Sequence, residues 1–201
     1  MVVLYTPPVP EKVSRTGFTF GFRLGIGFPG GMVAGAQAST GSTGNASDAF
    51  GVMLPVTVDV GYRLSPHWYV GGYASAAYAT AATCASEGTS TASCSETVYR
   101  FGLDAQFRLL PDHTWQPWIG VGAGWEVANQ FASDPTDGDT ASSADGVEFA
   151  HIDLGIDYRI SERQKVGPYF MTTFADYDNG YVHEWYIVGV RWHFDTNWSS
   201  R

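Results

Sequence analysis

The sequence has little charge, little lysine and no long apolar run. Charged residues make up 15% of the 201 residues, whereas a soluble domain usually has about 25%. No stretch of roughly 18 apolar residues occurs, which excludes a helical membrane protein. Only two lysines are present, Lys12 and Lys165, and the net charge is -9. This acidic balance excludes a nucleic-acid-binding protein, because such proteins need a basic surface.

Cysteine is scarce as well. Cys84 and Cys94 are the only two, and both lie in a stretch rich in Ser, Thr and Ala. Their spacing suits a local disulfide that closes a loop, and such a bond forms in an oxidising compartment. Two free surface thiols are the alternative. The amino-terminal segment lacks the basic region and the long apolar core of a secretory signal, so we expect that the signal has been removed.

What the sequence does contain is a regular alternation of apolar residues with polar or small ones. Between Phe18 and Phe28 nearly every second residue is large and apolar, and Thr, Gly and Arg stand between them. A period of two is typical of a β-strand with one apolar face. The parity of one segment, 166–177, is ambiguous. In all, eight segments are predicted to be strands: 18–28, 50–62, 68–78, 99–109, 115–127, 150–160, 166–177 and 186–194.

The connections between these segments alternate in length. Those after the second, fourth and sixth segments are tight turns, whereas those after the first, third and fifth run for about 15 to 20 residues of Gly, Ala, Ser, Thr and Asp. Short turns at one end and long loops at the other are typical of membrane barrels. The sequence therefore predicts an all-β fold, a closed up-and-down antiparallel transmembrane barrel of about eight strands. It occupies residues 17–194, after a Pro-rich lead-in at 1–16 and before a tail at 195–201.

Aromatic residues gather at both ends of the apolar face when the strands are laid up and down in order. Trp and Tyr favour the lipid headgroup level, where an apolar ring and a polar tip are both satisfied. The sequence thus predicts two aromatic girdles. One holds Tyr62, Trp68, Trp115, Tyr158, Trp192 and Phe194, and the other holds Phe28, Phe50, Tyr78, Tyr99, Trp125 and Tyr186.

The opposite parity carries charges of both signs and should face the interior of the barrel. An eight-stranded barrel is only just wide enough for side chains to fill it, and buried charges persist when they are paired. We therefore predict an ion-pair network that plugs the lumen, with Arg100 and Glu126 as one pair. A narrow polar path that opens when pairs exchange partners is the alternative. The predicted network comprises Arg23, Asp59, Arg100, Asp104, Arg108, Glu126, Asp153, Asp157 and Arg191.

The strand sequences GFRLGIGF, VDVGYRL, FGLDAQFRL and IDLGIDYRI, with the closing strand EWYIVGVRWHF, resemble small outer-membrane β-barrels of the OmpA/OmpX type. The resemblance covers residues 17–194 and extends to the broad porin-like barrel group. It implies a Gram-negative outer-membrane location. In that family an aromatic residue at the end of the last strand is read by the barrel-assembly machinery, and Phe194 matches this position. Here the chain continues to Arg201, which departs from the family pattern.

No residue pattern predicts an enzyme, a metal site or a cofactor. His151 and Asp153 share a face, but the serine that a hydrolase would need is missing beside them. The histidines at 67, 113, 183 and 193 are expected at turns or interfaces. The acidic stretch from Asp134 to Asp145 offers oxygen atoms but lacks the spacing of a Ca²⁺ loop, so a solvated loop is the preferred interpretation.

Three functions remain open. The first is a non-enzymatic outer-membrane protein that contributes to envelope integrity and surface contacts, with membrane lipid and lipopolysaccharide as candidate partners. The second is a small pore, or a lateral conduit for small or hydrophobic solutes, as in the OmpW-like members of the group. The third is a soluble lipocalin-like carrier, whose apolar face would point inward. The parity of the buried face separates the third function from the others.

Overall fold

The structure, a computed structural model, describes residues 16–37, 42–81, 93–134, 138–177 and 182–196. No helix in these ranges is long and apolar enough to cross a membrane. The elements along the chain are β1 (Gly17–Gln37), β2 (Ser42–Asn45), α1 (Ala46–Ala49), β3 (Phe50–Arg63), β4 (Trp68–Ala81), β5 (Ser93–Arg108), β6 (Trp115–Asp134), β7 (Gly138–Arg159), β8 (Gln164–Asp176) and β9 (Val182–Asp195).

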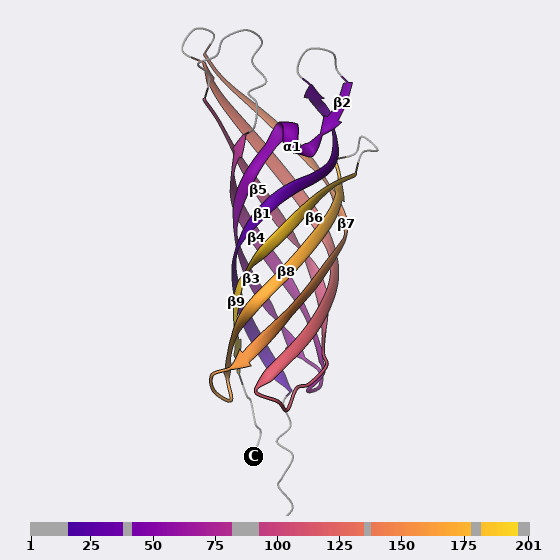
Figure 1. The fold of residues 1–201 in the computed structure, drawn as a ribbon, viewed down its shortest axis with the longest axis vertical. Helices are drawn as coiled ribbons and strands as arrows, with labels where there is room; N and C mark the ends of the chain where they lie inside the picture. Colours follow the sequence, from indigo (N-terminus) through magenta and orange to yellow (C-terminus); the bar gives the residue numbers. More distant parts are fainter. Residues whose placement is uncertain (1–15, 38–41, 82–92, 135–137, 178–181, 197–201) are drawn as a thin grey trace, which may run out of the picture.

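The strands form one antiparallel sheet that closes on itself (Figure 1). Strands β3 to β9 pair in sequence order, and β1 pairs with β3 on one side and with β9 on the other. The short β2 pairs only with the upper part of β1, from Met32 to Gln37. The prediction of a closed up-and-down barrel of eight strands is therefore confirmed, with β1 and β3 to β9 as its wall.

The two ends of the barrel differ. The lower end in Figure 1 holds the start of β1, the end of β9 and the short turns 64–67, 109–114 and 160–163. Two of these turns are closed by serine: the hydroxyl of Ser65 accepts a hydrogen bond from the Trp68 amide, and that of Ser161 accepts one from the Gln164 amide. Serine favours turns for this reason. The predicted tight connections therefore all lie at one end.

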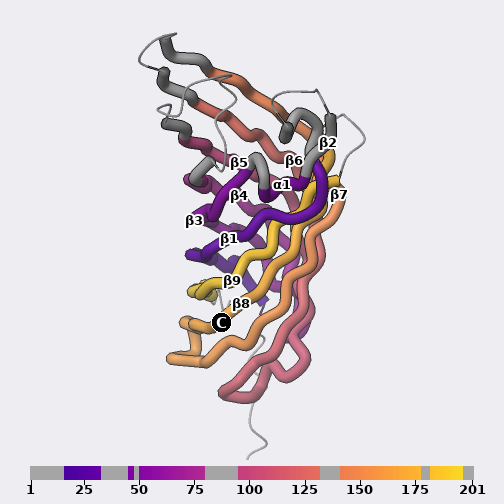
Figure 2. Tube along the Cα trace, turned by 45° about the horizontal axis from the view of Figure 1, so that its top comes forward, coloured from indigo at the N-terminus to yellow at the C-terminus, as the bar shows by residue number. Residues whose placement is uncertain are grey.

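At the upper end, the prediction of a long loop between segments 115–127 and 150–160 is wrong. Strand β6 continues to Asp134, β7 begins at Gly138, and the two pair along this whole extension. The resulting hairpin rises above the neighbouring strands in Figures 1 and 2. In the sequence of this extension, apolar and polar residues do not alternate. The strands are recognised there by their backbone pairing, which the sequence pattern does not reveal.

The polarity of the barrel is inverted relative to a soluble protein. The outward face is apolar, and Leu103 is 73% exposed on it, whereas the inward Arg23 is 2% exposed. Strand β8 resolves the ambiguous parity of its segment, because Lys165, Tyr169 and Thr173 point inward. The soluble carrier needs the opposite arrangement, so the structure does not support that alternative.

Aromatic side chains lie at both ends of the outward face. The register places Phe18 opposite Tyr62 and Trp115 opposite Tyr158 near the lower end, where the second pair of rings lies 4.9 Å apart. From Phe18 to Phe28 the strand advances ten residues, or about 25 Å along the axis of a tilted barrel, which matches the apolar band of known membrane barrels. At the other end, Phe28 lies opposite Tyr186, and both are exposed. We call the level of Tyr62 and Trp115 the lower aromatic row, and the level of Phe28, Tyr78, Tyr99, Trp125 and Tyr186 the upper aromatic row.

Phe50 is the exception to the predicted rows. It packs inward, with its ring 5.6 Å from that of Trp185 and 6.4 Å from that of His183. The pairing of β3 with β4 shifts register between Phe50 and Met53. An extra residue in one strand reverses the face to which the residues beyond it point. The assignment of Phe50 to the upper girdle was therefore wrong.

Candidate functional site

The interior of the barrel holds the largest concentration of polar groups among the described residues. Every member of the predicted lumen network is at most 4% exposed. Strands on all sides of the wall contribute to it, since inward and outward residues alternate along each strand. The inward charged groups beyond those predicted are Arg63, Glu96, Glu148, His151, Lys165, His183, His193 and Asp195.

Arg23 is the hub of the middle of the lumen. Its Nε and Nη2 donate to the two carboxylate oxygens of Asp59 at 2.8 and 2.7 Å. Its Nη1 donates to Asp153 at 2.8 Å, and Nη2 also reaches Asp104 at 3.3 Å. A planar guanidinium with several donors suits such convergent carboxylates. One side chain from β1 thus connects β3, β5 and β7 across the lumen.

Arg191 on β9 forms a second junction just below Arg23. Its Nε and Nη2 bind both oxygens of Asp157 at 2.8 and 2.6 Å, and its Nη1 donates to Gln106 at 2.9 Å. The guanidinium lies 3.3 Å from the centre of the Trp118 ring. Trp118 faces inward from β6 and was not predicted as part of the network. Bidentate pairing and aromatic stacking together hold Arg191 in one geometry.

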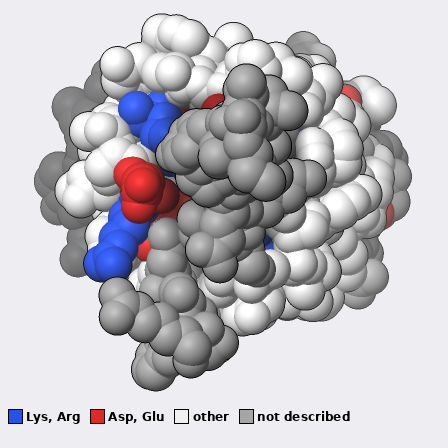
Figure 3. Space-filling view, turned by 90° about the horizontal axis from the view of Figure 1, so that it is seen from below, with Lys and Arg blue, Asp and Glu red and all other residues white. Residues whose placement is uncertain are grey.

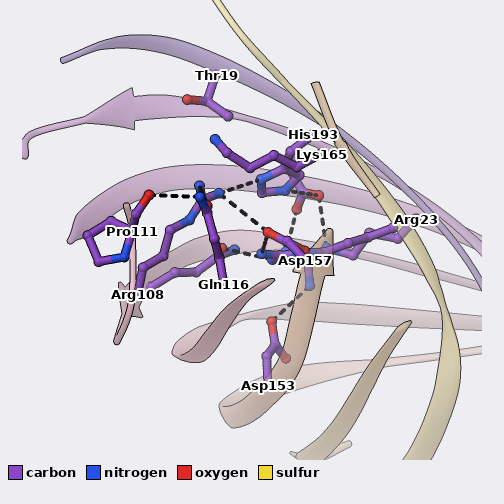
Figure 4. A network of polar contacts seen from close by, with 12 residues as sticks. Thr19, Arg23, Arg108, Pro111, Gln116, Asp153, Asp157, Lys165 and His193 are labelled. Atoms are coloured by element: carbon purple, nitrogen blue, oxygen red, sulfur yellow. Dashed lines mark hydrogen bonds and ion pairs between the residues drawn. The ribbon is translucent and has the colours of Figure 1, made fainter. Parts of the chain in front are cut away.

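The lower mouth is closed around Asp195. Its carboxylate accepts hydrogen bonds from Thr19 at 2.9 Å and from Arg63 at 2.7 Å, and it also binds the Lys165 ammonium. Nearby, Arg108 donates to Gln116 at 3.2 Å, and Gln116 donates to the carbonyl oxygen of Pro111 at 2.7 Å (Figure 4). Seen from below, basic and acidic side chains lie side by side in this mouth (Figure 3).

The upper lumen is built differently, from two units that each contain a tyrosine, a glutamate and a histidine. In the first, Glu148 Oε1 accepts a hydrogen bond from Tyr73 at 2.9 Å and lies 2.5 Å from His151 Nδ1. In the second, Glu126 Oε1 binds the Tyr177 hydroxyl and lies 2.9 Å from His183 Nε2. The second oxygen of each glutamate has no hydrogen-bond partner in the described part of the chain.

Glycine makes room for the first of these units. A Cβ at Gly122 would meet the His151 ring at 2.4 Å, and one at Gly124 would meet the Tyr73 hydroxyl at 2.5 Å. Both glycines face the lumen from β6, opposite the strands that carry the larger side chains. The glycines of β6 thus decide which side chains the upper lumen can hold.

The predicted pair of Arg100 and Glu126 lies directly opposite in the register of β5 and β6, but no hydrogen bond joins the two side chains. Glu126 lies one residue above Trp125 and Arg100 lies one residue below Tyr99, so the pair is at the level of the upper row. Higher up on β5, burial and the charge of Glu126 raise the pKa of Glu96 to about 8.

Part of the upper lumen is apolar, which the alternation alone did not predict. Met53, Trp185 and Ile187 are fully buried and form a cluster with Ala77, Ala79, Val98, Ala128 and Met171. These residues share the inward parity with the charged groups. The signal that could have revealed them is the large apolar residues, such as Ile187, at positions assigned to the polar face.

Three further sequence interpretations can be compared with the structure. The assignment of His183 and His193 to interfaces was wrong, because both are 1% exposed and lie inside the lumen. The disulfide stays a prediction, since Cys84 lies outside the described residues. The interpretation of the acidic stretch as a solvated loop also stays a prediction, because residues 135–137 lie outside the described residues. Among the described residues, no three His, Cys, Asp or Glu side chains are arranged to hold a metal ion.

Comparison with known proteins finds likeness in structure only. No protein-family model and no curated protein sequence matches the chain. The crystal structure of Neisserial surface protein A (NspA) superimposes with a TM-score of 0.56 at 9% identity, over 90% of this chain and 97% of that one. Ail, the attachment invasion locus protein of Yersinia pestis, in complex with the heparin analogue sucrose octasulfate, gives 0.51 at 9% identity, over 90% and 99%. The chain therefore has the fold of small outer-membrane β-barrels.

Proposed function

We propose that this chain is an integral, non-enzymatic barrel of a bacterial outer membrane that contributes to envelope integrity through a sealed lumen. The observation that carries this function is the inverted polarity of the wall. A continuous apolar face encloses the barrel, while charges fill the interior. Soluble monomers rarely expose contiguous apolar patches larger than a few hundred Å². Lipid is the solvent in which this face is stable, and every strand finds its hydrogen-bond partners within the closed sheet.

The contacts inside the lumen support a seal. Arg23 bridges β1 to β3, β5 and β7, and Arg191 bridges β9 to β7 and β5. Because these bonds cross the barrel at successive levels, an ion would have to displace several buried pairs. A pore or conduit would require these pairs to exchange partners, and the tight bidentate geometry of both arginines opposes this.

The partner that this function implies is membrane lipid. Lipopolysaccharide, held through its acyl chains against the apolar wall, and the assembly machinery are part of the same proposal. Ail is described with a heparin analogue, a polyanion. This chain does not suit a comparable contact, because neither Lys nor Arg occurs in residues 24–62, 64–99, 109–158 or 166–190. Polyanions are held mainly by such side chains. The upper end suits cationic or neutral partners.

The test of membrane insertion is fractionation followed by gel electrophoresis with and without boiling. We expect the protein to require detergent and to change its mobility on boiling, since a folded barrel resists the denaturing detergent. A chain that stays soluble without detergent would contradict the proposal.

The test of sealing is conductance in planar lipid bilayers. We expect the unaltered chain to give no more current than a bare bilayer. The double variant Arg23→Ala and Arg191→Ala should conduct, because it removes both cross-lumen junctions. Arg163→Ala, in an exposed turn, is the matched control and should stay silent. Stable channels from the unaltered chain would favour the pore.

A further inference from the structure

A cavity of about 640 Å³ lies at the upper end, outside the lumen network. It forms where β8 ends at Asp176, opposite Val147, while β7 continues upward along β6. The hairpin of β6 and β7 contributes one side of its lining, and the end of β8 contributes the other. We call this hollow the rim cavity. Its main lining residues are Trp125, Asp145, Val147, Phe149, Asp176 and Tyr177.

The lining of the rim cavity is amphipathic. Trp125, Val147 and Phe149 belong to the outward face, where they are 37%, 45% and 50% exposed. Asp145 and Asp176 add carboxylates to the lining. No basic residue lines the cavity, and the sequence has none anywhere in residues 109–158 or 166–190. The chemistry therefore favours a ligand with an apolar part and a positive group.

Tyr177 closes the inner side of the rim cavity. Its ring points into the lumen, where it is stacked on His183 at 4.1 Å, and its hydroxyl donates to the buried Glu126. These contacts hold Tyr177 in place. Because Trp125 and Phe149 face outward, they are the aromatic side chains that a ligand on the outward face would meet.

We propose that the rim cavity binds the ammonium headgroup of a membrane lipid, of the choline or ethanolamine type. The ammonium group lies against Trp125 within the field of Asp145, and the acyl chains run down over Val147 and Phe149. An aromatic ring with a nearby carboxylate is the chemistry that recognises such cations. The cavity also lies at the upper aromatic row, the level of lipid headgroups. This inference rests on the proposed membrane location.

The experiment uses the folded full chain in nonionic maltoside micelles, titrated with dihexanoylphosphatidylcholine below its micelle concentration. Saturation-transfer NMR follows the N-methyl protons of the lipid, and calorimetry gives the affinity. Dihexanoylphosphatidylglycerol, which has the same acyl chains but no ammonium, is the matched ligand control. Free choline tests whether the source is a lipid or a solute. We expect saturable binding of the choline lipid, with both controls at least about tenfold weaker.

Variants locate the site. Trp125→Leu and Asp145→Asn should each weaken binding of the choline lipid about three- to tenfold, because each removes one attraction to the cation. Trp115→Leu is the matched control, since Trp115 lies on the same strand in the lower row and contacts Tyr158. That variant should bind like the unaltered chain.

Three results would overturn the inference. Equal affinity for the choline and glycerol lipids would show a simple apolar groove, and free choline that binds as tightly as the lipid would show a solute site. Absence of binding would reject the site altogether. Boiled and unboiled samples of the same preparation, compared on a gel, report separately on the barrel. A failure here thus leaves the proposed membrane function intact.

Discussion

The lower and upper parts of the lumen bury similar charges in different ways. The lower part, which includes the middle of the lumen around Arg23, pairs carboxylates with guanidinium or ammonium groups, as Asp59 with Arg23 and Asp157 with Arg191. Above, Glu126 and Glu148 bind a tyrosine hydroxyl and a histidine ring, and each keeps one oxygen without a partner in the described part of the chain. The lower part is closed by paired charge, and the upper part combines directed hydrogen bonds with apolar packing.

This difference bears on the roles of the two parts. An arginine that makes several hydrogen bonds is hard to displace, because each lost bond leaves a charge unpaired in the low-dielectric interior. Glu126 and Glu148 are each held through one oxygen by a tyrosine hydroxyl and a histidine ring, so fewer bonds oppose a rearrangement there. The lower lumen therefore suits a seal, and the upper lumen suits an end that contacts other molecules. Substitutions in the two parts should therefore differ in how much unfolding free energy they cost.

The largest effect is expected for Arg23→Gln in the lumen hub. It leaves Asp59, Asp104 and Asp153 without their shared cation, which should cost about 3 to 5 kcal/mol of unfolding free energy. Urea unfolding of the refolded barrel in lipid vesicles measures this. The paired variant Arg100→Gln should cost much less, because Nε and Nη2 of Arg100 have no hydrogen-bond partner among the described residues. Equal losses would remove the distinction between the two parts.

A smaller loss is expected for Arg191→Lys, in the lower lumen. Lysine keeps the charge but cannot bind both oxygens of Asp157 and stack on Trp118, so about 2 to 3 kcal/mol should be lost. The same unfolding assay applies. Arg163→Lys, in an exposed turn, serves as control and should change nothing measurable. If the charge alone stabilises the junction, Arg191→Lys will match that control.

Gly122→Ala tests the packing of the upper lumen. The new methyl group would meet the His151 ring at 2.4 Å and the Leu103 carbonyl at the same distance. Overpacking of this kind costs about 1 to 3 kcal/mol. The matched control is Gly72→Ala, because a Cβ there meets its nearest atom, the Gly102 carbonyl oxygen, at 3.4 Å. Equal free energies of unfolding for the two variants would show that the upper lumen has room for the added methyl group.

The smallest effect is expected for Glu126→Gln. The change replaces charge-assisted hydrogen bonds by neutral ones, a difference of about 1 kcal/mol at pH 7. Urea unfolding at pH 7 in the same vesicles measures this difference. Glu126→Ala is the matched variant, because it removes the acceptor of both hydrogen bonds and should cost more. Equal losses of unfolding free energy in the two variants would show that a neutral amide holds neither Tyr177 nor His183.

Sequence reasoning succeeded for the wall because the bilayer imposes a local rule. Every strand must present apolar residues to one side, so segments such as 99–109 are recognisable by themselves. It failed where that rule stops acting. In the extension of β6 and β7 beyond the apolar band, apolar and polar residues do not alternate. Near Phe50, the register shift turns the side chain from the outward to the inward face, and no residue type in the sequence indicates this shift.

The partners inside the lumen could not be predicted for a different reason. Arg23 and Asp153 are 130 positions apart in the chain, and their contact exists only because β1 closes onto β9. Membership of the inward face was readable, but the alternation does not say which inward residue meets which. Arg100 and Glu126 show this limit: they are neighbours in register, yet Glu126 binds Tyr177 and His183 instead.

The sequence by itself determined the class of fold, the inward and outward faces and the band between the aromatic rows. These follow from the period of two that a strand imposes on its side chains. Only the tertiary structure decided which charges pair, where the lumen is apolar and where the rim cavity opens. Those features depend on the curvature and closure of the sheet, which bring together side chains from strands far apart in the chain.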